Sequence, residues 1–535
     1  MTEEKLFSKG RVAVNAASSL FAHVLNLAVL LWLQQYLLRR VSPAEYSLYP
    51  VMISVMVLLY MLRLILTSSI ARYTTEAYAR EDETGVTKVA TTTFLLAAAI
   101  GSVILAAGYF FCLNVDQVLT VQPDLVDDAT VMAWILLLSF AFQFTLTPFE
   151  VGLYATQKFV YLNVLRTLTN VLRIIFLFVL LFGIDTRVLW VVVASEAASV
   201  LGCLLTVRAS VRALPCLRVA RGAFDKTVAR RLLSFGSWTF VSQLAYRIIT
   251  SADPIILNKF GTPLDVTCYH LASLARKHLH NTIQVATQPL LPALTAMHAR
   301  NKRAMLGSTY LRYGRYYLWA FLFVALPAIV FSSELIRLYV GGRFAPAAII
   351  LVLMLTESIP FLGNFMLYSL AVATERIRDL ARPIILLQFV NLALTLYLVG
   401  VCRMGALGAA LATFIITGVS GVLVEVPLGL RLAGVKFREW LLKTALPGYL
   451  PAVASLVPLL SAKFFLKPDS WLELGAAGAA ASTVYLAVVV LFALQEEDRR
   501  DLRRVLLRIG AAAGRRRARP AERPPVPEEV GPEGR

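Results

Sequence analysis

The sequence contains little charge and few cysteines. Only 16% of its 535 residues are charged and 58% are hydrophobic, whereas soluble domains carry roughly 25% charged residues. The five cysteines are scattered and mostly lie inside apolar runs, without the close pairs that a metal site or a redox motif needs. The low share of charged residues excludes a large soluble domain, and the scattered cysteines argue against a metal centre. Most of the chain is therefore expected to lie in lipid.

The common catalytic motifs are also missing from the sequence. It has no GxxxxGKS-like phosphate loop, no HExxH, no GxSxG and no CxxC. We therefore expect a protein that is not an enzyme and that needs no cofactor. Without a nucleotide site, the energy for any transport would come from an ion gradient or from later consumption of the substrate.

Long apolar runs are instead abundant. A bilayer core of roughly 30 Å needs about 20 apolar residues per helix, and runs of that length predict an all-α integral membrane protein with about fourteen transmembrane helices. The first span lacks the cleavage signature of a secretory signal and is expected to be retained. The predicted spans lie at 12–38, 46–70, 89–113, 130–154, 160–183, 188–207, 232–258, 266–291, 316–336, 346–371, 383–402, 405–430, 444–466 and 471–494.

The net charge of +19 is typical of nucleic-acid binding, but the basic residues lie between the apolar spans rather than on one soluble face. Most of the 52 Lys and Arg residues fall on alternate loops, as the positive-inside rule requires for a chain with both termini in the cytoplasm. The loop 114–130 has four Asp and no Lys or Arg, which suits the opposite side. Membrane lipids, and not nucleic acid, are the partners that this pattern predicts.

The chain also repeats itself at a shift of 220 residues, which places Arg11 on Arg231, Ser42 on Thr262 and Tyr49 on Tyr269. Six predicted spans separate the copies, so the repeats are parallel, and transporters commonly bind substrate between such halves. This organisation predicts two six-helix lobes followed by two C-terminal helices. The expected boundaries are 1–208 for the first lobe, 209–231 for a basic cytoplasmic linker, 232–430 for the second lobe, 431–495 for the last two helices and 496–535 for a basic, largely disordered tail.

Three stretches carry a family resemblance: LLRRVSPAEYSLYPVMISV in the first lobe, YHLASLARKHLHNTIQVATQPLLPALTAMHARNK in the second, and the run from ATERIRDLARPIILLQ to GALGAALATFIITG. They resemble polysaccharide flippases of the multidrug, oligosaccharidyl-lipid and polysaccharide (MOP) exporter superfamily, over most of residues 10–430. Ser47 departs from the glycine that the family usually has there. The resemblance implies a flippase of the bacterial cytoplasmic membrane that works by alternating access. Its substrate would be a polyprenyl-pyrophosphate-linked oligosaccharide for O-antigen, capsule or exopolysaccharide, handled alongside other glycan-assembly proteins.

Cations inside the predicted spans are candidates for binding that anionic substrate. A charge in the bilayer is costly and persists when it is paired or functional, and the planar guanidinium of Arg can engage two phosphate oxygens at once. In the eighth span the polar residues follow a spacing of three and four, so they form one stripe on a helix. The substrate-binding candidates are Arg63, Arg247, Arg276, Lys277, His280 and Gln284.

Acids within the spans support two interpretations. Asp253, Glu357 and Glu425 are candidates for binding a coupling ion, either a proton or sodium. In the alternative, Arg247 and Arg276 pair with Glu357 and with Asp253, and the cations are structural. Two further pairs at matching depths are predicted to be structural ion pairs, namely Arg173 with Glu196 and Glu150 with Arg166.

Several other functions stay open at this stage. Within transport, the alternatives are a flippase for the lipid-linked peptidoglycan precursor and a multidrug exporter, although an exporter of cationic drugs should have an acidic cavity. From another class, a polytopic glycan polymerase or ligase is the rival. Such enzymes usually place catalytic Arg or His in a sizeable outer loop, whereas every outer loop predicted here is short.

Overall fold

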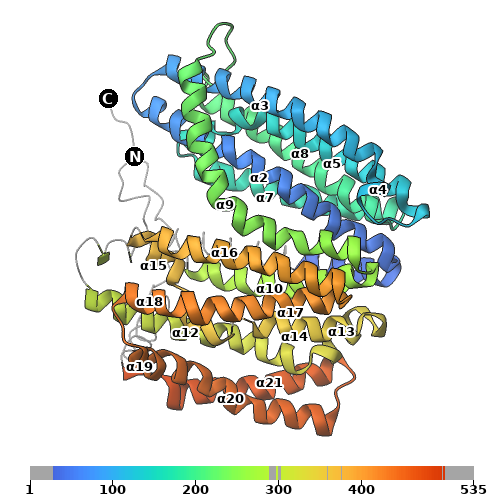
Figure 1. The fold of residues 1–535 in the computed structure, drawn as a ribbon, viewed down its shortest axis with the longest axis vertical. Helices are drawn as coiled ribbons and strands as arrows, with labels where there is room; N and C mark the ends of the chain where they lie inside the picture. The colour runs from blue at the N-terminus through green and yellow to red at the C-terminus, as the bar shows by residue number, and fades with distance from the viewer. Residues whose placement is uncertain are drawn as a thin grey trace, which may run out of the picture.

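The computed structural model describes residues 28–287, 294, 297–298, 303–357, 359–374, 376–496 and 498–499. In these residues all regular structure is helical (Figure 1). Ten of the helices are long and apolar enough to cross a membrane, and α2, α9 and α10 add three more of 25 to 37 residues. The predicted all-α membrane fold is confirmed, and its number of long helices is close to the expected fourteen.

Figure 1 shows the helices in two groups, with α9 (Lys226–Phe260) lying between them. The first group contains α2 (Pro43–Ala79), α3 (Glu83–Leu113), α5 (Val126–Glu150), α7 (Phe159–Gly183) and α8 (Val188–Ala213), with the short helices α4 (Val115–Val118) and α6 (Gly152–Ala155). The second contains α10 (Pro263–Thr287), α12 (Arg303–Val330), α13 (Ser332–Val340), α14 (Ala347–Thr356), α16 (Ile377–Leu396), α17 (Gly405–Ser420) and α18 (Val426–Ala433). The last helices are α19 (Phe437–Trp440), α20 (Leu446–Ser461) and α21 (Trp471–Val488). The lobe boundaries themselves remain a prediction.

Side-chain caps fix several helix starts, because the first backbone N–H groups of a helix have no partner within it. Ser42 accepts from the N–H of Glu45 at the start of α2, where Pro43 supplies a pre-set φ. Asp82 begins α3 and Asp225 begins α9 in the same way. These hydrogen bonds from backbone N–H groups lower the pKa of both aspartates.

One predicted span is broken in the structure. The span expected at 346–371 consists of α14, the 3-10 helix η4 (Ile359–Asn364) and α15 (Leu367–Ala373). Short π-helical turns interrupt several other helices, at Tyr397–Val401, Gly421–Glu425, Leu441–Ala445, Ala462–Leu466 and Val489–Ala493. Such turns occur frequently at functional sites, and one of them contains Glu425.

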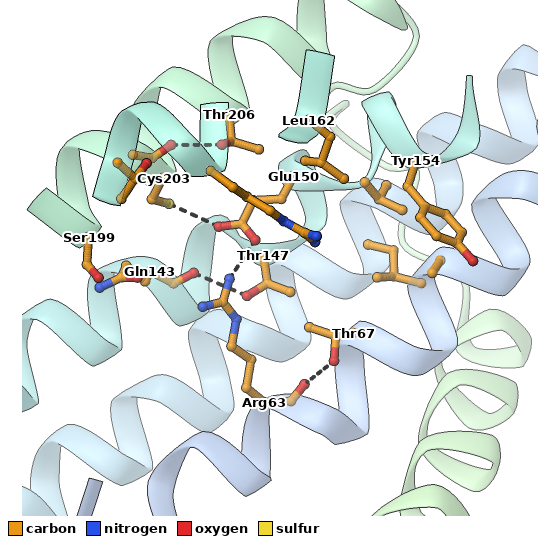
Figure 2. A pocket seen from close by; sticks show the side chains of 16 residues that line it. Arg63, Thr67, Gln143, Thr147, Glu150, Tyr154, Leu162, Ser199, Cys203 and Thr206 are labelled. Carbon is orange, nitrogen blue, oxygen red and sulfur yellow. Dashed lines mark hydrogen bonds and ion pairs between the residues drawn. The ribbon is translucent and has the colours of Figure 1, made fainter. Parts of the chain in front are cut away.

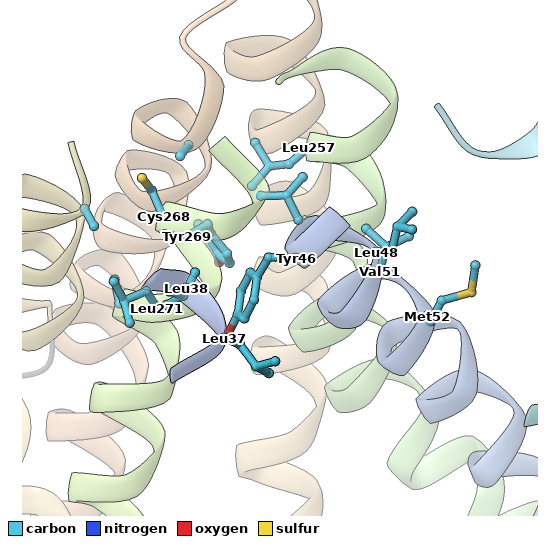
Figure 3. Close-up of a cluster of buried hydrophobic side chains, with 14 of the residues drawn as sticks. Leu37, Leu38, Tyr46, Leu48, Val51, Met52, Leu257, Cys268, Tyr269 and Leu271 are labelled. Atoms are coloured by element: carbon cyan, nitrogen blue, oxygen red, sulfur yellow. The ribbon is translucent and has the colours of Figure 1, made fainter. Parts of the chain in front are cut away.

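The two groups of helices meet at one end of the molecule, in a continuous buried cluster (Figure 3). Leu37 and Tyr46 pack there with Leu257 and Tyr269 of the second half. The Thr267 hydroxyl donates to the carbonyl oxygen of Pro43, 3.3 Å away. We call this the α13 end of the molecule, because α13 also lies there.

Candidate functional site

A cavity of about 370 Å³ lies in the first group of helices, between α2, α5, α7 and α8 (Figure 2). Its polar side chains come in rows that follow the helical spacing of three and four residues. The rows are Arg63 and Thr67 on α2, Gln143, Thr147 and Glu150 on α5, and Ser199, Cys203 and Thr206 on α8. The sequence analysis singled out Arg63 and Glu150 as charges within apolar spans, but not the rows on α5 and α8. These two rows carry the same signal, a polar stripe in an apolar helix, and could have been found by it.

An ion pair stands at the centre of this cavity. A guanidinium nitrogen of Arg63 lies 2.6 Å from a carboxylate oxygen of Glu150, and the two side chains are 18% and 26% exposed. The Cys203 thiol donates to the other carboxylate oxygen, with sulfur 3.2 Å from Oε1 (Figure 2). Arg63 therefore already has an anionic partner in this conformation, and its role in binding substrate stays a prediction.

The end of α5 positions Glu150. The helix stops at this residue, two positions after Pro148, and the Ser210 hydroxyl of α8 donates to the Glu150 carbonyl oxygen at 2.9 Å. Gly152 packs so closely on α8 that a Cβ there would lie 2.5 Å from the Ser210 carbonyl oxygen. A larger residue at 152 would push α6 away from α8, so glycine holds the backbone beside Glu150 in place.

One of the two predicted structural pairs has a different geometry. Glu150 bonds Arg63 rather than Arg166, which lines the same cavity. Glu196 accepts a short hydrogen bond from Ser139, and Ser139 in turn accepts one from Gln143 at 2.9 Å. This chain of hydrogen bonds connects Glu196 to the wall of the cavity. The pairing of Arg173 with Glu196 stays a prediction.

The predicted polar stripe on α10 contacts both α9 and helices of the second group. Arg276 forms an ion pair with Glu357, at the end of α14. The Tyr269 hydroxyl donates to Asp253 of α9, and Nδ1 of His280 lies 2.9 Å from the Tyr317 hydroxyl of α12. The contact between Arg276 and Glu357 is the one that the structural alternative expected.

The remaining candidates have varied surroundings. Lys277 is exposed, and Glu425 accepts a hydrogen bond of 3.0 Å from the Ser420 hydroxyl. The side chains of Arg247 and Gln284 lie outside the described part of the structure. In the described residues no three His, Cys, Asp or Glu side chains are grouped so that they could hold a metal ion.

The two arginine pairs occupy corresponding places in the two groups of helices. Arg63 lies in the second predicted span and Glu150 in the fourth, while Arg276 lies in the eighth and Glu357 in the tenth. In each lobe as predicted, an arginine of the second helix therefore pairs with a glutamate of the fourth. The repeated arrangement places a neutralised cation on either side of the contact between the groups.

Comparisons with known proteins give a consistent picture. Residues 12–298 match the family model described as polysaccharide biosynthesis protein. The structure is similar to the lipid II flippase MurJ in an inward closed conformation, with 15% sequence identity, 89% of this chain and 98% of that chain covered, and a TM-score of 0.66. It is also similar to an inward-facing multidrug resistance MATE family transporter of the MOP superfamily, with 14% identity, 76% and 95% coverage, and a TM-score of 0.57.

A third similar structure is a MOP superfamily transporter from Pyrococcus furiosus, with 14% identity, 77% of this chain and 94% of that chain covered, and a TM-score of 0.51. No curated protein sequence gives a significant match. At these low identities the structural likenesses show a shared fold.

Proposed function

Because the chain belongs to the polysaccharide biosynthesis protein family of the MOP superfamily, we propose that this multi-pass membrane transporter is a flippase for a polyprenyl-pyrophosphate-linked oligosaccharide. It would work in the bacterial cytoplasmic membrane by alternating access, with both termini in the cytoplasm and no catalytic step. Its products would enter O-antigen, capsule or exopolysaccharide synthesis, next to other glycan-assembly proteins.

The observation that carries this proposal is the repeated arginine–glutamate pair. A guanidinium binds a phosphate through two parallel hydrogen bonds, and these charge-assisted bonds are about twice as strong as neutral ones. A pyrophosphate carries more negative charge than one carboxylate, so it can compete for Arg63 against Glu150 and for Arg276 against Glu357. In this proposal the substrate binds by exchange, taking each arginine from its glutamate.

The exchange also suggests how an ion gradient is used. Glu357 is 2% exposed, and a buried carboxylate without a cationic partner is strongly unfavourable. When the substrate occupies Arg276, Glu357 therefore gains affinity for a proton or a sodium ion. Release of that ion on the other side of the membrane would return Glu357 to Arg276 and displace the substrate.

The charge of the cavity favours an anionic substrate over the alternatives. Two arginines, Arg63 and Arg166, line it against the single acid Glu150, whereas an exporter of cationic drugs needs an excess of acids. The lipid-linked peptidoglycan precursor shares the pyrophosphate and stays the runner-up. A polymerase or ligase needs a large outer loop, yet only a few residues connect α7 to α8 and α9 to α10.

The test measures translocation of a lipid-linked oligosaccharide in vesicles and the lipid intermediates that accumulate in cells. We expect R63A and R276A to reduce translocation at least about tenfold, and R63K and R276K to restore it only in part, because an ammonium lacks the two-pronged geometry. K277A is the matched control, since Lys277 is exposed and neighbours Arg276. Equal translocation in all the variants, at equal membrane abundance, would contradict the proposal. Accumulation of the peptidoglycan precursor alone would select the runner-up.

A further inference from the structure

A second cavity lies on the outside of the first group of helices, where α6 turns into α7 and where α8 ends. Its volume is about 580 Å³. Lys158 and Arg212 are its charged lining residues, and Tyr161 and Val164 of α7 form part of its wall. Buried Leu153 and Ala209 pack beneath it against Leu165. The cavity is therefore a groove with a packed apolar floor and two cations at one end.

Both cations face solvent or lipid, with no acid beside them among the residues that the structure describes. Lys158 and Arg212 are exposed, and neither takes part in any of the ion pairs found in the described part of the chain. This differs from Arg63 and Arg276, which have carboxylate partners. Within the described residues, the groove thus has two cationic side chains and no acid in its lining.

An apolar surface continues from the groove along α7. The helix presents exposed aliphatic and aromatic side chains at steps of three or four residues, so they form one stripe along its length. This stripe consists of Val164, Leu168, Val171, Ile175, Val179 and Phe182. It begins beside the two cations and runs away from them, in the direction of the membrane interior that α7 spans.

We propose that this groove is a binding site for an anionic phospholipid of the surrounding membrane. The headgroup phosphate lies between Lys158 and Arg212, and the acyl chains lie along the stripe of α7. The two cations would lie at the membrane boundary, like the headgroup phosphate of a phospholipid. The apolar stripe would lie deeper in the membrane, like the acyl chains. Exposed Tyr161 stands at the same level, where aromatic residues favour the interface. The site is separate from the cavity around Arg63, so the inference does not depend on the transported substrate.

Native mass spectrometry of the purified full-length protein in detergent tests the site, with phosphatidylglycerol and phosphatidylcholine as probes. Each Lys or Arg near an anionic lipid surface contributes about fivefold in affinity. We therefore expect K158Q/R212Q to lower the affinity for phosphatidylglycerol about 25-fold and to leave that for phosphatidylcholine unchanged. The control K436Q/R438Q removes two exposed cations at the start of the helical segment Phe437–Leu466 and should retain the tight site.

Four results would overturn the proposal. The first is equal affinity of the unchanged protein for the two phospholipids, and the second is an equal loss in K158Q/R212Q and K436Q/R438Q. The third is a mass showing a stable dimer that V164N/L168N dissociates, because the stripe would then pack on a second copy. A polyprenyl phosphate that displaces phosphatidylglycerol from the unchanged protein, but not from K158Q/R212Q, would assign the groove to the substrate instead.

Discussion

The glutamates of the two arginine pairs differ in their distance from water. Glu150 is 26% exposed and has Cys203 as a second hydrogen-bond partner, whereas Glu357 is 2% exposed. The second carboxylate oxygen of Glu357, Oε2, is buried and has no hydrogen-bond partner in the part of the chain that the structure describes. Loss of the arginine should therefore be much more costly for Glu357 than for Glu150, because water can solvate Glu150.

This difference predicts unequal effects on stability. R276A should destabilise the protein by up to roughly 3 to 5 kcal/mol, because it leaves Glu357 buried without its cation, and R63A by clearly less. The replacement of both partners, R276M/E357L, should recover much of the loss because no buried charge remains. Thermal unfolding in detergent measures all three variants. A double variant no more stable than R276A would show that the two residues do not act as a pair.

The sequence located these charged residues but identified only some of their partners. A charge within an apolar run is visible in one dimension, so Arg63, Glu150, Arg276 and Glu357 could all be found. Depth along the membrane was the only guide to pairing, and it placed Arg166 level with Glu150. The partner depends on how each helix is rotated and on where α5 stops, and Ser210 and Gly152 set both through contacts that local sequence does not reveal.

At the scale of the elements, one acidic residue recurs in both copies of the repeat and has a structural role. It is Glu45 after Ser42 and Pro43 in the first copy, and Asp265 after Thr262 and Pro263 in the second. Glu45 accepts a hydrogen bond of 2.8 Å from the backbone N–H of Val188, the first residue of α8. Asp265, at the position 220 residues later, accepts one of 3.0 Å from the N–H of Ala406 at the start of α17. Each acid therefore caps the sixth predicted span of its own lobe. The shared role explains why an acid recurs at this position in both copies.

Loss of either cap should lower stability without changing the charge of the transport path. E45A and D265A should each cost about 1 kcal/mol, the usual value for an N-cap. E76A is the control, because Glu76 forms only an exposed pair with Arg80 on α2 and should cost almost nothing. Thermal unfolding in one detergent compares the three. A loss in E76A as large as that in E45A would show that the effect comes from charge and not from capping.

Element positions were predicted better than element continuity. Hydropathy gave the spans, because each helix must bury about the same length in lipid. It gave no sign that the span 346–371 breaks at η4. At the break, Gly314 of α12 lies so near Gly363 that a Cβ on Gly314 would stand 2.2 Å from the Gly363 carbonyl oxygen. Pro360 also lies in this segment, and proline breaks or kinks a helix because it lacks the backbone N–H. Hydropathy averages over both features.

At the scale of the whole molecule, the segment after α21 is tied to the second group of helices. Asp498 is 1% exposed and forms ion pairs with Arg312 and Arg315 of α12. The Tyr316 hydroxyl donates to the same carboxylate at 2.5 Å. Arg315 is itself buried and also donates to the carbonyl oxygen of Lys443. The sequence placed this residue in a basic, largely disordered tail, because it is one of three consecutive acids in a highly charged stretch, which gives no signal of burial.

These contacts predict that Asp498 contributes more to stability than its position near the C-terminus suggests. D498A should destabilise the protein by roughly 3 to 5 kcal/mol, because it leaves Arg315 buried without its acid. D469A is the control, since Asp469 pairs with Arg337 at the surface and both are more than half exposed. Membrane abundance and thermal unfolding measure the two variants. If D498A and D469A unfold at the same temperature, the contact does not hold the segment in place.

Contacts at the α13 end join the halves of the chain and must break if that end opens during transport. Arg39 donates to the carbonyl oxygens of Leu338 and Tyr339 at 2.7 and 3.2 Å, where α13 ends. The Tyr339 hydroxyl donates back to the Leu31 carbonyl oxygen at 2.5 Å. A cation at the C-terminus of a helix is stabilised by the unpaired carbonyl groups there. Arg39 therefore holds the first helix against α13 in this conformation.

R39A should shift the protein toward the state that is open at the α13 end. Two hydrogen bonds of about 0.5 to 1.5 kcal/mol each correspond to at least about a fivefold increase in the open population. The reporter is T267C in a protein whose five native cysteines are replaced by Ser, because Thr267 is buried against Pro43 when this end is closed. Its rate of labelling by a maleimide should rise in R39A. R40A is the matched control, since the neighbouring Arg40 stacks on Tyr36 instead, 4.9 Å from the ring centre. If R39A and R40A label at the same rate, α13 does not keep this end closed, and the buried cluster around Tyr46 and Tyr269 must do so alone.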